Sequence, residues 1–192
     1  MEQPLETHPW QPFLPENCRI LMLGSFPPAR KRWCMDFFYP NYTNDMWRIF
    51  GIIFKNDKLH FVDEAAHTYK LSDIVQLLNE EGIGMYDTAR VVRRTKNTAS
   101  DKDLEVVEPT DLDALLEAAP HCHNLVTTGQ KATDVLCAHF QISQPAVGKF
   151  VEFQTKDGRR MRLFRMPSSS RAYPMKVEKK AESYQKMFNS II

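Results

Sequence analysis

The side chains best suited to chemistry gather between residues 24 and 47, in the stretch GSFPPARKRWCMDFFYPNYTNDMW. Loops are usually polar and poor in aromatic residues, but this stretch has two adjacent prolines near its start, then a basic triplet and many aromatic rings around two asparagines. Aromatic faces can stack on a nucleobase, and the candidates are Phe26 and one of Phe37, Phe38 or Tyr39. Because the basic triplet suits an anionic partner, the stretch predicts a ligand that is both flat and anionic.

Two further features suit a phosphate group. Gly24 follows an apolar run, where glycine permits a sharp turn and lets the next amides point at a ligand. The segment 167–174, PSSSRAYP, follows a predicted strand and precedes a predicted helix, so its hydroxyls and amides can bind a phosphate. An ordinary helix cap and turn explains the same serines, and both interpretations stay open. No GxSxG, HExxH or His/Cys metal spacing occurs, so we expect no metal and no cofactor.

The order of apolar and periodic segments predicts the elements that position these groups. Continuous apolar runs predict strands buried on both faces at 18–24, 83–89 and 124–129. Two alternating runs around Asp157-Gly158 predict a hairpin whose second arm enters the main sheet. Helical spacing predicts helices over 43–54, 71–81, 110–118 and 130–140, and one behind Pro174.

Local signals also predict where some helices begin and end. Ser72 is the expected N-cap of the second helix and Gly82 its end. Thr110 with Asp113 resembles a capping box that opens the third helix.

Alternating strands and helices predict an α/β sandwich around a mostly parallel sheet. We expect one domain over residues 1–192, with residues 1–17 as an extended arm. Ligands bind beyond the carboxyl ends of the strands in such sheets. That rule selects four segments: 24–47, 87–98, 129–131 and 167–176.

These four segments carry much of the arginine and lysine of the chain, including Arg30, Lys131 and Arg171. A nearly neutral protein would then have one basic edge, which is typical of a protein that binds a phosphate backbone. Solvated loop charges are the alternative explanation.

The composition narrows the class of protein. The chain has 192 residues, a net charge of +1 and 43% hydrophobic residues, as a globular domain does. No stretch is apolar for long enough to span a bilayer, so we expect no membrane partner. The four cysteines lack a framework spacing, which favours reduced thiols. We therefore expect a cytoplasmic protein, and a monomer.

Four motifs, in this order, resemble the uracil-DNA glycosylase superfamily, and the hypoxanthine-DNA glycosylase-like branch is the most similar. The first motif is Gly24-Ser25-Phe26-Pro27 followed by Asn44-Asp45-Met46-Trp47. The second is Tyr86-Asp87 followed by Ala99-Ser100-Asp101. The others are Gly129-Gln130-Lys131-Ala132 and Pro167-Ser168-Ser169-Ser170.

The resemblance implies a three-layer α/β/α sandwich and a monofunctional DNA glycosylase. Such an enzyme flips a deaminated base, uracil or hypoxanthine, out of DNA and hydrolyses its N-glycosidic bond. DNA containing a damaged base is the implied partner, and base-excision repair the implied process.

The resemblance also implies roles for individual residues. Some branches place an acid or amide at the position of Phe26 and a histidine at that of Met166, so the catalytic role moves to Asn44, with Asn41 as a rival. Asn44 would hold the attacking water, amides around Ser25 would stabilise the departing base, and Asp87 would read the base or orient water. The implied base-binding residues are Gly24, Phe26, Pro27, Phe38, Tyr39 and Asn41. The implied DNA contacts are Arg30, Lys131, Ser168, Ser169, Ser170 and Arg171.

Two alternatives to an enzyme remain at this stage. One is a nucleic-acid or nucleotide-binding module of the same fold with little chemistry, which the missing acidic and histidine catalytic residues favour. The other is an unrelated α/β protein for a small ligand, although no cofactor fingerprint supports it.

Overall fold

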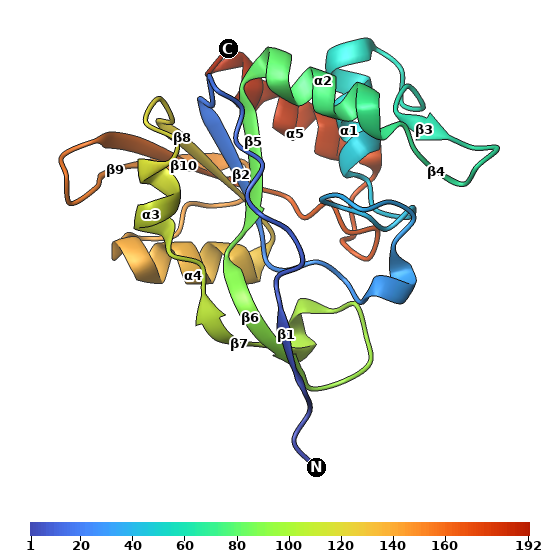
Figure 1. Cartoon of the computed structure of the whole chain (residues 1–192). Helices are drawn as coiled ribbons and strands as arrows, with labels where there is room; N and C mark the ends of the chain where they lie inside the picture. Colours follow the sequence, from blue (N-terminus) through green and yellow to red (C-terminus); the bar gives the residue numbers. More distant parts are fainter.

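A central sheet of five strands, in the order β5-β2-β8-β10-β9, organises the computed structural model, which describes residues 1–192 (Figure 1). Four strands run parallel, and β9 joins the edge as the antiparallel arm of a hairpin. The predicted strands and hairpin are therefore confirmed. The strands are β2 (Ile20–Gly24), β5 (Ile83–Asp87), β8 (Asn124–Thr128), β9 (Lys149–Gln154) and β10 (Arg160–Met166).

Helices cover both faces of this sheet and complete a three-layer α/β/α sandwich (Figure 1). One face carries α1 (Met46–Lys55), α2 (Leu71–Glu81) and α5 (Val177–Asn189). The other carries α3 (Leu112–Glu117) and α4 (Gln130–Phe140). None of these helices has the length and apolarity that crossing a membrane requires.

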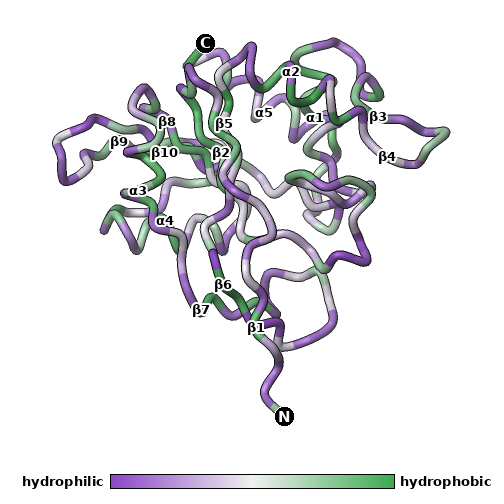
Figure 2. Tube along the Cα trace, viewed as in Figure 1, coloured by the Kyte–Doolittle hydropathy of each residue, from purple (hydrophilic) through white to green (hydrophobic).

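The three inner strands form the centre of the core. Every residue of β2, β5 and β8 is buried, because helices cover the sheet on both sides and each side chain meets a helix or its neighbours. Figure 2 shows hydrophobic residues concentrated along these strands. This is why the apolar runs in the sequence were reliable indicators of strands.

A second, antiparallel sheet lies beyond the end of β5 and was not predicted. It has the order β1-β6-β7, with β1 at Leu5–Thr7, β6 at Ala89–Arg94 and β7 at Leu104–Pro109. The expected loop 87–98 is therefore largely a strand, and the arm is not merely extended but pairs with it. Strands β6 and β7 are rich in charge, so neither has a clear apolar signal. A small hairpin of β3 (Val62–Asp63) and β4 (Thr68–Tyr69) completes the strands.

The helix-end predictions are partly wrong. Gly82 ends α2 with φ 65°, as expected. The N-cap of α2 is Lys70 and not Ser72, which lies inside the first turn of the helix. Helix α3 is capped by Asp111, whose carboxylate accepts the N–H of Ala114. Thr110 instead donates its hydroxyl to the carbonyl of Asp87 at 2.7 Å, which ties α3 to the end of β5.

Candidate functional site

A cleft of about 670 Å³ opens at the carboxyl edge of the central sheet. Strands β2, β5 and β8 end in residues that line it, and the serine segment that follows β10 lines it as well. The arm, β6 and the segment between β6 and β7 add others. This volume lies within the range of roughly 300–1,000 Å³ that ligand sites occupy. The strand-end rule thus located the cleft, although it could not supply the second sheet that forms one wall.

Gly24 and Asp87 are neighbours in the register of β2 and β5 and lie together in the cleft. A Cβ on Gly24 would approach Asp87 Oδ1 to 2.7 Å, so the glycine leaves the space that the carboxylate occupies. The expectation that Gly24 makes a sharp turn is corrected, because its φ is not positive and it ends a regular strand.

Tyr39 reaches the same region from the aromatic loop. Its hydroxyl is 2.9 Å from Thr128 Oγ1 at the end of β8, and its backbone is left-handed, with φ 52°. Burial, and then the nearby Asp87 carboxylate, raises the pKa of Tyr39, so its phenol stays protonated. Tyr39 therefore presents a neutral polar group to the cleft.

The Asp87 carboxylate is held from the arm by His8. His8 Nε2 lies 2.7 Å from Asp87 Oδ2, and the side chains are 1% and 10% exposed. Asp87 Oδ1 makes no hydrogen bond within the protein, yet it is not among the polar atoms sealed from solvent. Asp87 therefore has one oxygen fixed by the protein and one open to the cleft.

A second carboxylate, Asp101, lies in the cleft between β6 and β7. Ser25 donates its hydroxyl to Asp101 Oδ1 at 2.8 Å. Burial raises the pKa of Asp101, while the Ser25 hydrogen bond and the charge of Lys131 oppose that shift. A carboxyl group in such surroundings can carry a proton nearer to neutral pH than usual, as a general acid or base requires.

Asn41 and Asn44 both line the cleft, but their amide oxygens serve the backbone. Asn44 Oδ1 accepts the N–H of Met46 at 2.9 Å, which satisfies a donor at the start of α1. Asn41 Oδ1 accepts the N–H and the hydroxyl of Thr43. The Nδ2 group of Asn44 makes no hydrogen bond within the protein, so Asn44 can offer a ligand a donor held in fixed orientation.

The aromatic candidates divide between cleft and core. Phe26 and Pro27 line the cleft, and Arg94 is 5.8 Å from the Phe26 ring centroid and donates to the Pro27 carbonyl. Phe38 is only 3% exposed and packs against Trp10 and Phe37, so its expected contact with a base is wrong. A sequence of consecutive aromatic residues cannot show which rings point inward.

The serine segment also lines the cleft, and it is built as a series of turns. Ser168 Oγ accepts the N–H of Ser170, and Ser170 Oγ accepts the N–H of Ala172. Ser169 is buried, and its carbonyl accepts the N–H of Asp45 at 2.9 Å. Both interpretations of this segment are therefore compatible: its hydroxyls shape the turn, and the turn faces the cleft.

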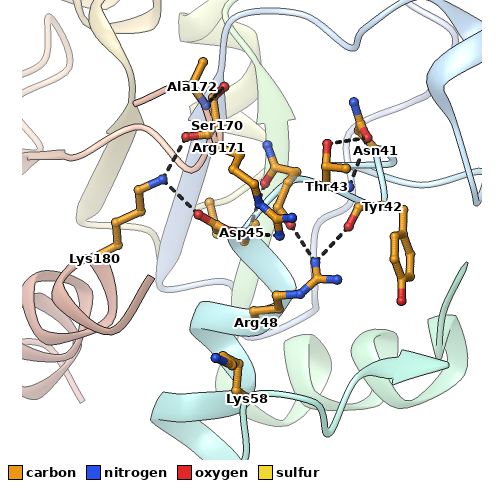
Figure 3. Close-up of polar contacts among 12 residues, drawn as sticks. Asn41, Tyr42, Thr43, Asp45, Arg48, Lys58, Ser170, Arg171, Ala172 and Lys180 are labelled. Carbon is orange, nitrogen blue, oxygen red and sulfur yellow. Dashed lines mark hydrogen bonds and ion pairs between the residues drawn. The ribbon is translucent and has the colours of Figure 1, made fainter. Parts of the chain in front are cut away.

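Buried charges join the serine segment to the start of α1 (Figure 3). Lys180 of α5 is fully buried, and its Nζ is 3.0 Å from Asp45 Oδ2 and 2.8 Å from the Ser170 carbonyl. Arg171 lies 3.3 Å from Asp45 Oδ1 but is 55% exposed. We define Asp45, Arg171 and Lys180 as the Asp45 cluster. It fixes the loop that carries Asn44 relative to the serine segment.

Arg48 stabilises the same loop from the other side (Figure 3). Its NH1 group donates to the carbonyls of Tyr42 and Asn44 and to the hydroxyl of Tyr69. Arg48 is 8% exposed, so it is not part of a free basic surface. Arg48 thus has a structural role in this loop.

The expected basic edge is smaller than predicted, because many of its charges are paired within the protein. Arg90, Arg93 and Arg94 each form ion pairs with glutamates of the second sheet or the arm. Lys131 lines the cleft and donates to the Leu104 carbonyl at 2.6 Å. Arg30, in the exposed 3-10 turn Arg30–Arg32, forms no ion pair and stacks on Trp33.

The residues that the sequence did not reveal either line the cleft or support it: Trp10 and Thr128 line it, whereas His8 contacts Asp87 and Lys180 contacts Asp45. His8 and Trp10 belong to the arm, Thr128 ends β8, and Lys180 lies on the buried side of α5. Asp101 matched a motif but carried no role. A histidine among prolines and a lysine within an apolar helical stripe were the only local signals.

Comparisons with known proteins agree with this architecture. No protein-family model matches the chain, and no curated protein does. The solution NMR structure of a protein from Methanosarcina acetivorans, described as a "putative" uracil DNA glycosylase, is similar to it with a TM-score of 0.63. The match covers 98% of this chain and 99% of that one, at 20% sequence identity. Nothing in it singles out the hypoxanthine-directed branch. The chain therefore has the α/β fold of that uracil DNA glycosylase-like structure over nearly its whole length.

Proposed function

We propose that the protein is a monofunctional DNA glycosylase that removes a deaminated base, uracil or hypoxanthine, from DNA. The observation that carries this proposal is the Asp87 carboxylate, with one oxygen anchored and one open, in a cleft of about 670 Å³. A group placed in this way can orient a water molecule toward a sugar carbon. The fold shared with a glycosylase-like protein supports the same conclusion.

The chemistry can be assigned to residues in the cleft. As the bond between the sugar C1′ and the base nitrogen breaks, its electron pair leaves with the base and the sugar becomes cationic. Asp87 Oδ1 stabilises that cation and orients a water molecule, whose oxygen bonds to C1′ and whose proton passes to a carboxylate. Asp101 is the second carboxyl group available for proton transfer.

Asn44 is assigned to the departing base. Since its Oδ1 is occupied by the Met46 N–H, the group it offers is the Nδ2 donor. This donor suits a carbonyl oxygen of the base, which gains negative charge as the bond breaks. Backbone amides near Ser25 and Phe26 are the further candidates for this task. The resemblance implied that Asn44 holds the attacking water; we propose this different role because its Oδ1 is occupied.

Deamination explains why such a site selects a modified base. Uracil and hypoxanthine both carry a carbonyl next to a ring N–H where cytosine and adenine carry an amino group and an acceptor nitrogen. A carboxylate accepts that N–H and an amide donor binds that carbonyl. Phe26 and Tyr39, which line the cleft, are the proposed ring contacts.

DNA would approach the cleft through its polar rim. Ser168 and Lys131 line it, and the N-terminus of α4 begins there at Gln130. Arg30, Lys31 and Arg32 lie on an exposed turn linked to the rim through the contact between Trp33 and Trp10. We propose these groups as the phosphate contacts.

A cleavage assay tests the proposal. Purified protein with EDTA is incubated with labelled single- and double-stranded oligonucleotides containing uracil, hypoxanthine, xanthine or only normal bases, followed by alkali. Cleavage at uracil or hypoxanthine that is lost in Asp87→Asn is the expected result. If the protein binds these oligonucleotides but cleaves none of them, the proposed glycosylase activity is refuted and a nucleic-acid-binding module of the same fold is favoured.

A further inference from the structure

A buried hydrogen bond connects the arm to Asp87 of the cleft. His8 Nε2 and Asp87 Oδ2 are 2.7 Å apart, and the residues are 79 positions apart in the chain. The His8 side chain is 1% exposed, so water cannot replace this hydrogen bond. A surface-lying arm that served only to cover the fold would not need a polar side chain at this position.

The direction of the hydrogen bond follows from its carboxylate partner, and the contacts of the second ring nitrogen are compatible with it. His8 Nδ1 lies 3.1 Å from the backbone N–H and 3.0 Å from the carbonyl of Trp10. A neutral ring that accepts from the Trp10 N–H carries its proton on Nε2, and a charged ring carries protons on both nitrogens. Because a carboxylate oxygen accepts, Nε2 donates to Asp87 Oδ2 in either of these states.

The arm itself is firmly attached, which gives His8 a defined position. Strand β1 pairs with β6, and the His8 N–H donates to the Arg90 carbonyl at 2.7 Å. Glu6 forms an ion pair with Arg94 at 2.6 Å. The His8 ring also packs against Tyr86 with 4.5 Å between the ring centroids. Its imidazole therefore has one orientation available, with Nε2 directed at Asp87.

We propose that His8 is a positioning residue that selects the reactive orientation of Asp87 and makes the N-terminal arm part of the active site. By binding Oδ2, it leaves Oδ1 toward the cleft, where Gly24 has no side chain to obstruct it. Positioning of this kind raises a reaction rate because the carboxylate need not reorient in the transition state. This inference rests on the proposed function through the role of Asp87.

Two substitutions separate positioning from simple packing. His8→Gln keeps a donor at the same distance along the side chain as Nε2, whereas His8→Leu keeps bulk and removes the donor. The wild type and both variants are compared by thermal unfolding, by single-turnover cleavage of the preferred base, and by affinity for two DNA probes. One probe contains an ordinary abasic analogue, and the other a cationic pyrrolidine in place of the target sugar.

Positioning predicts a cleavage rate in His8→Leu at least about tenfold below that of wild type. Its affinity for the pyrrolidine DNA should also fall, while its affinity for the ordinary abasic probe stays unchanged. His8→Gln should recover most of both losses. A wild-type rate in His8→Leu, or equal losses in both variants that follow their thermal stability, would overturn the inference.

The cationic probe also separates this inference from the proposed function. If wild-type protein cleaves no base but His8→Leu alone loses preference for the pyrrolidine probe, the inference stands and the proposed activity fails. If wild-type protein cleaves no base and His8→Leu binds both probes as wild type does, the positioning role is refuted as well.

Discussion

The Asp45 cluster offers a quantitative test of how the candidate site is held together. Lys180 is fully buried, and it bonds both the Asp45 carboxylate and the Ser170 carbonyl. Replacing it with methionine keeps the length and apolar volume of the side chain but removes the charge. Asp45, which is 5% exposed, would then be left as a buried carboxylate facing only Arg171.

Removing one partner of a buried ion pair costs about 3–5 kcal/mol, because the remaining charge stays desolvated. Arg171 still lies 3.3 Å from the other carboxylate oxygen, but it is 55% exposed and its interaction is screened. We therefore expect Lys180→Met to lose about 3 kcal/mol, at the lower end of that range. For a chain of 192 residues this corresponds to a fall in Tm of about 6–12 °C.

A double-mutant cycle measures the coupling between Lys180 and Asp45. It compares the free energies of unfolding in urea of Lys180→Met, Asp45→Asn and the double variant with that of wild type. The double variant has no buried charge left in the cluster, so it should be more stable than Lys180→Met, with a coupling energy of about 2 kcal/mol. A loss below about 1 kcal/mol in Lys180→Met, or effects that simply add in the double variant, would refute the proposed role of the cluster.

Substitutions at four further positions test individual parts of the site. Asn44→Ala should lose about 1 kcal/mol of stability and most of the cleavage activity. Asn44→Asp keeps the oxygen that accepts the Met46 N–H, so it should lose cleavage activity but not stability. Urea unfolding measures the stability and single-turnover rates measure the cleavage. Gly24→Ala places a Cβ 2.7 Å from Asp87 Oδ1 and should slow cleavage about 100-fold with unchanged DNA affinity; a wild-type rate would contradict the assigned geometry. Burial raises the pKa of Asp101, so the native state is stabilised while Asp101 is protonated and loses this stability as pH rises through the native pKa. At pH 7, Asp101→Asn should therefore unfold at a higher urea concentration than wild type. The difference should vanish below the ordinary carboxyl pKa of 3.8. Arg171→Ala should reduce the slope of log affinity for DNA against log salt by about 1, and an unchanged slope would exclude a phosphate contact there.

Much of the central architecture could be predicted from the sequence, because its signals are local. Buried parallel strands need continuous apolar runs, and 18–24, 83–89 and 124–129 each contain the expected strand. The turn at Asp157-Gly158 identified the hairpin, and Gly82 the end of α2. Strand ends then located the cleft.

The second sheet and the N-caps of α2 and α3 could not be predicted in this way. Strands β1, β6 and β7 are short or charged, and they are stable because they pair with one another. Three of the arginines that suggested a basic edge, Arg90, Arg93 and Arg94, are paired with glutamates that lie far away in the sequence. Arg93, for example, contacts both Glu2 and Glu105.

The sequence by itself determined which residue types reach the carboxyl edge of the sheet, because strand order and turn residues are encoded locally. Only the tertiary structure decided how those residues are used. In the folded chain Phe38 is buried in the core, and the side-chain oxygen of Asn44 accepts a backbone N–H at the start of α1. His8 contacts Asp87, and Lys180 contacts Asp45. Hydrogen bonds and ion pairs between distant segments depend on packing of the whole chain, and no local pattern specifies them.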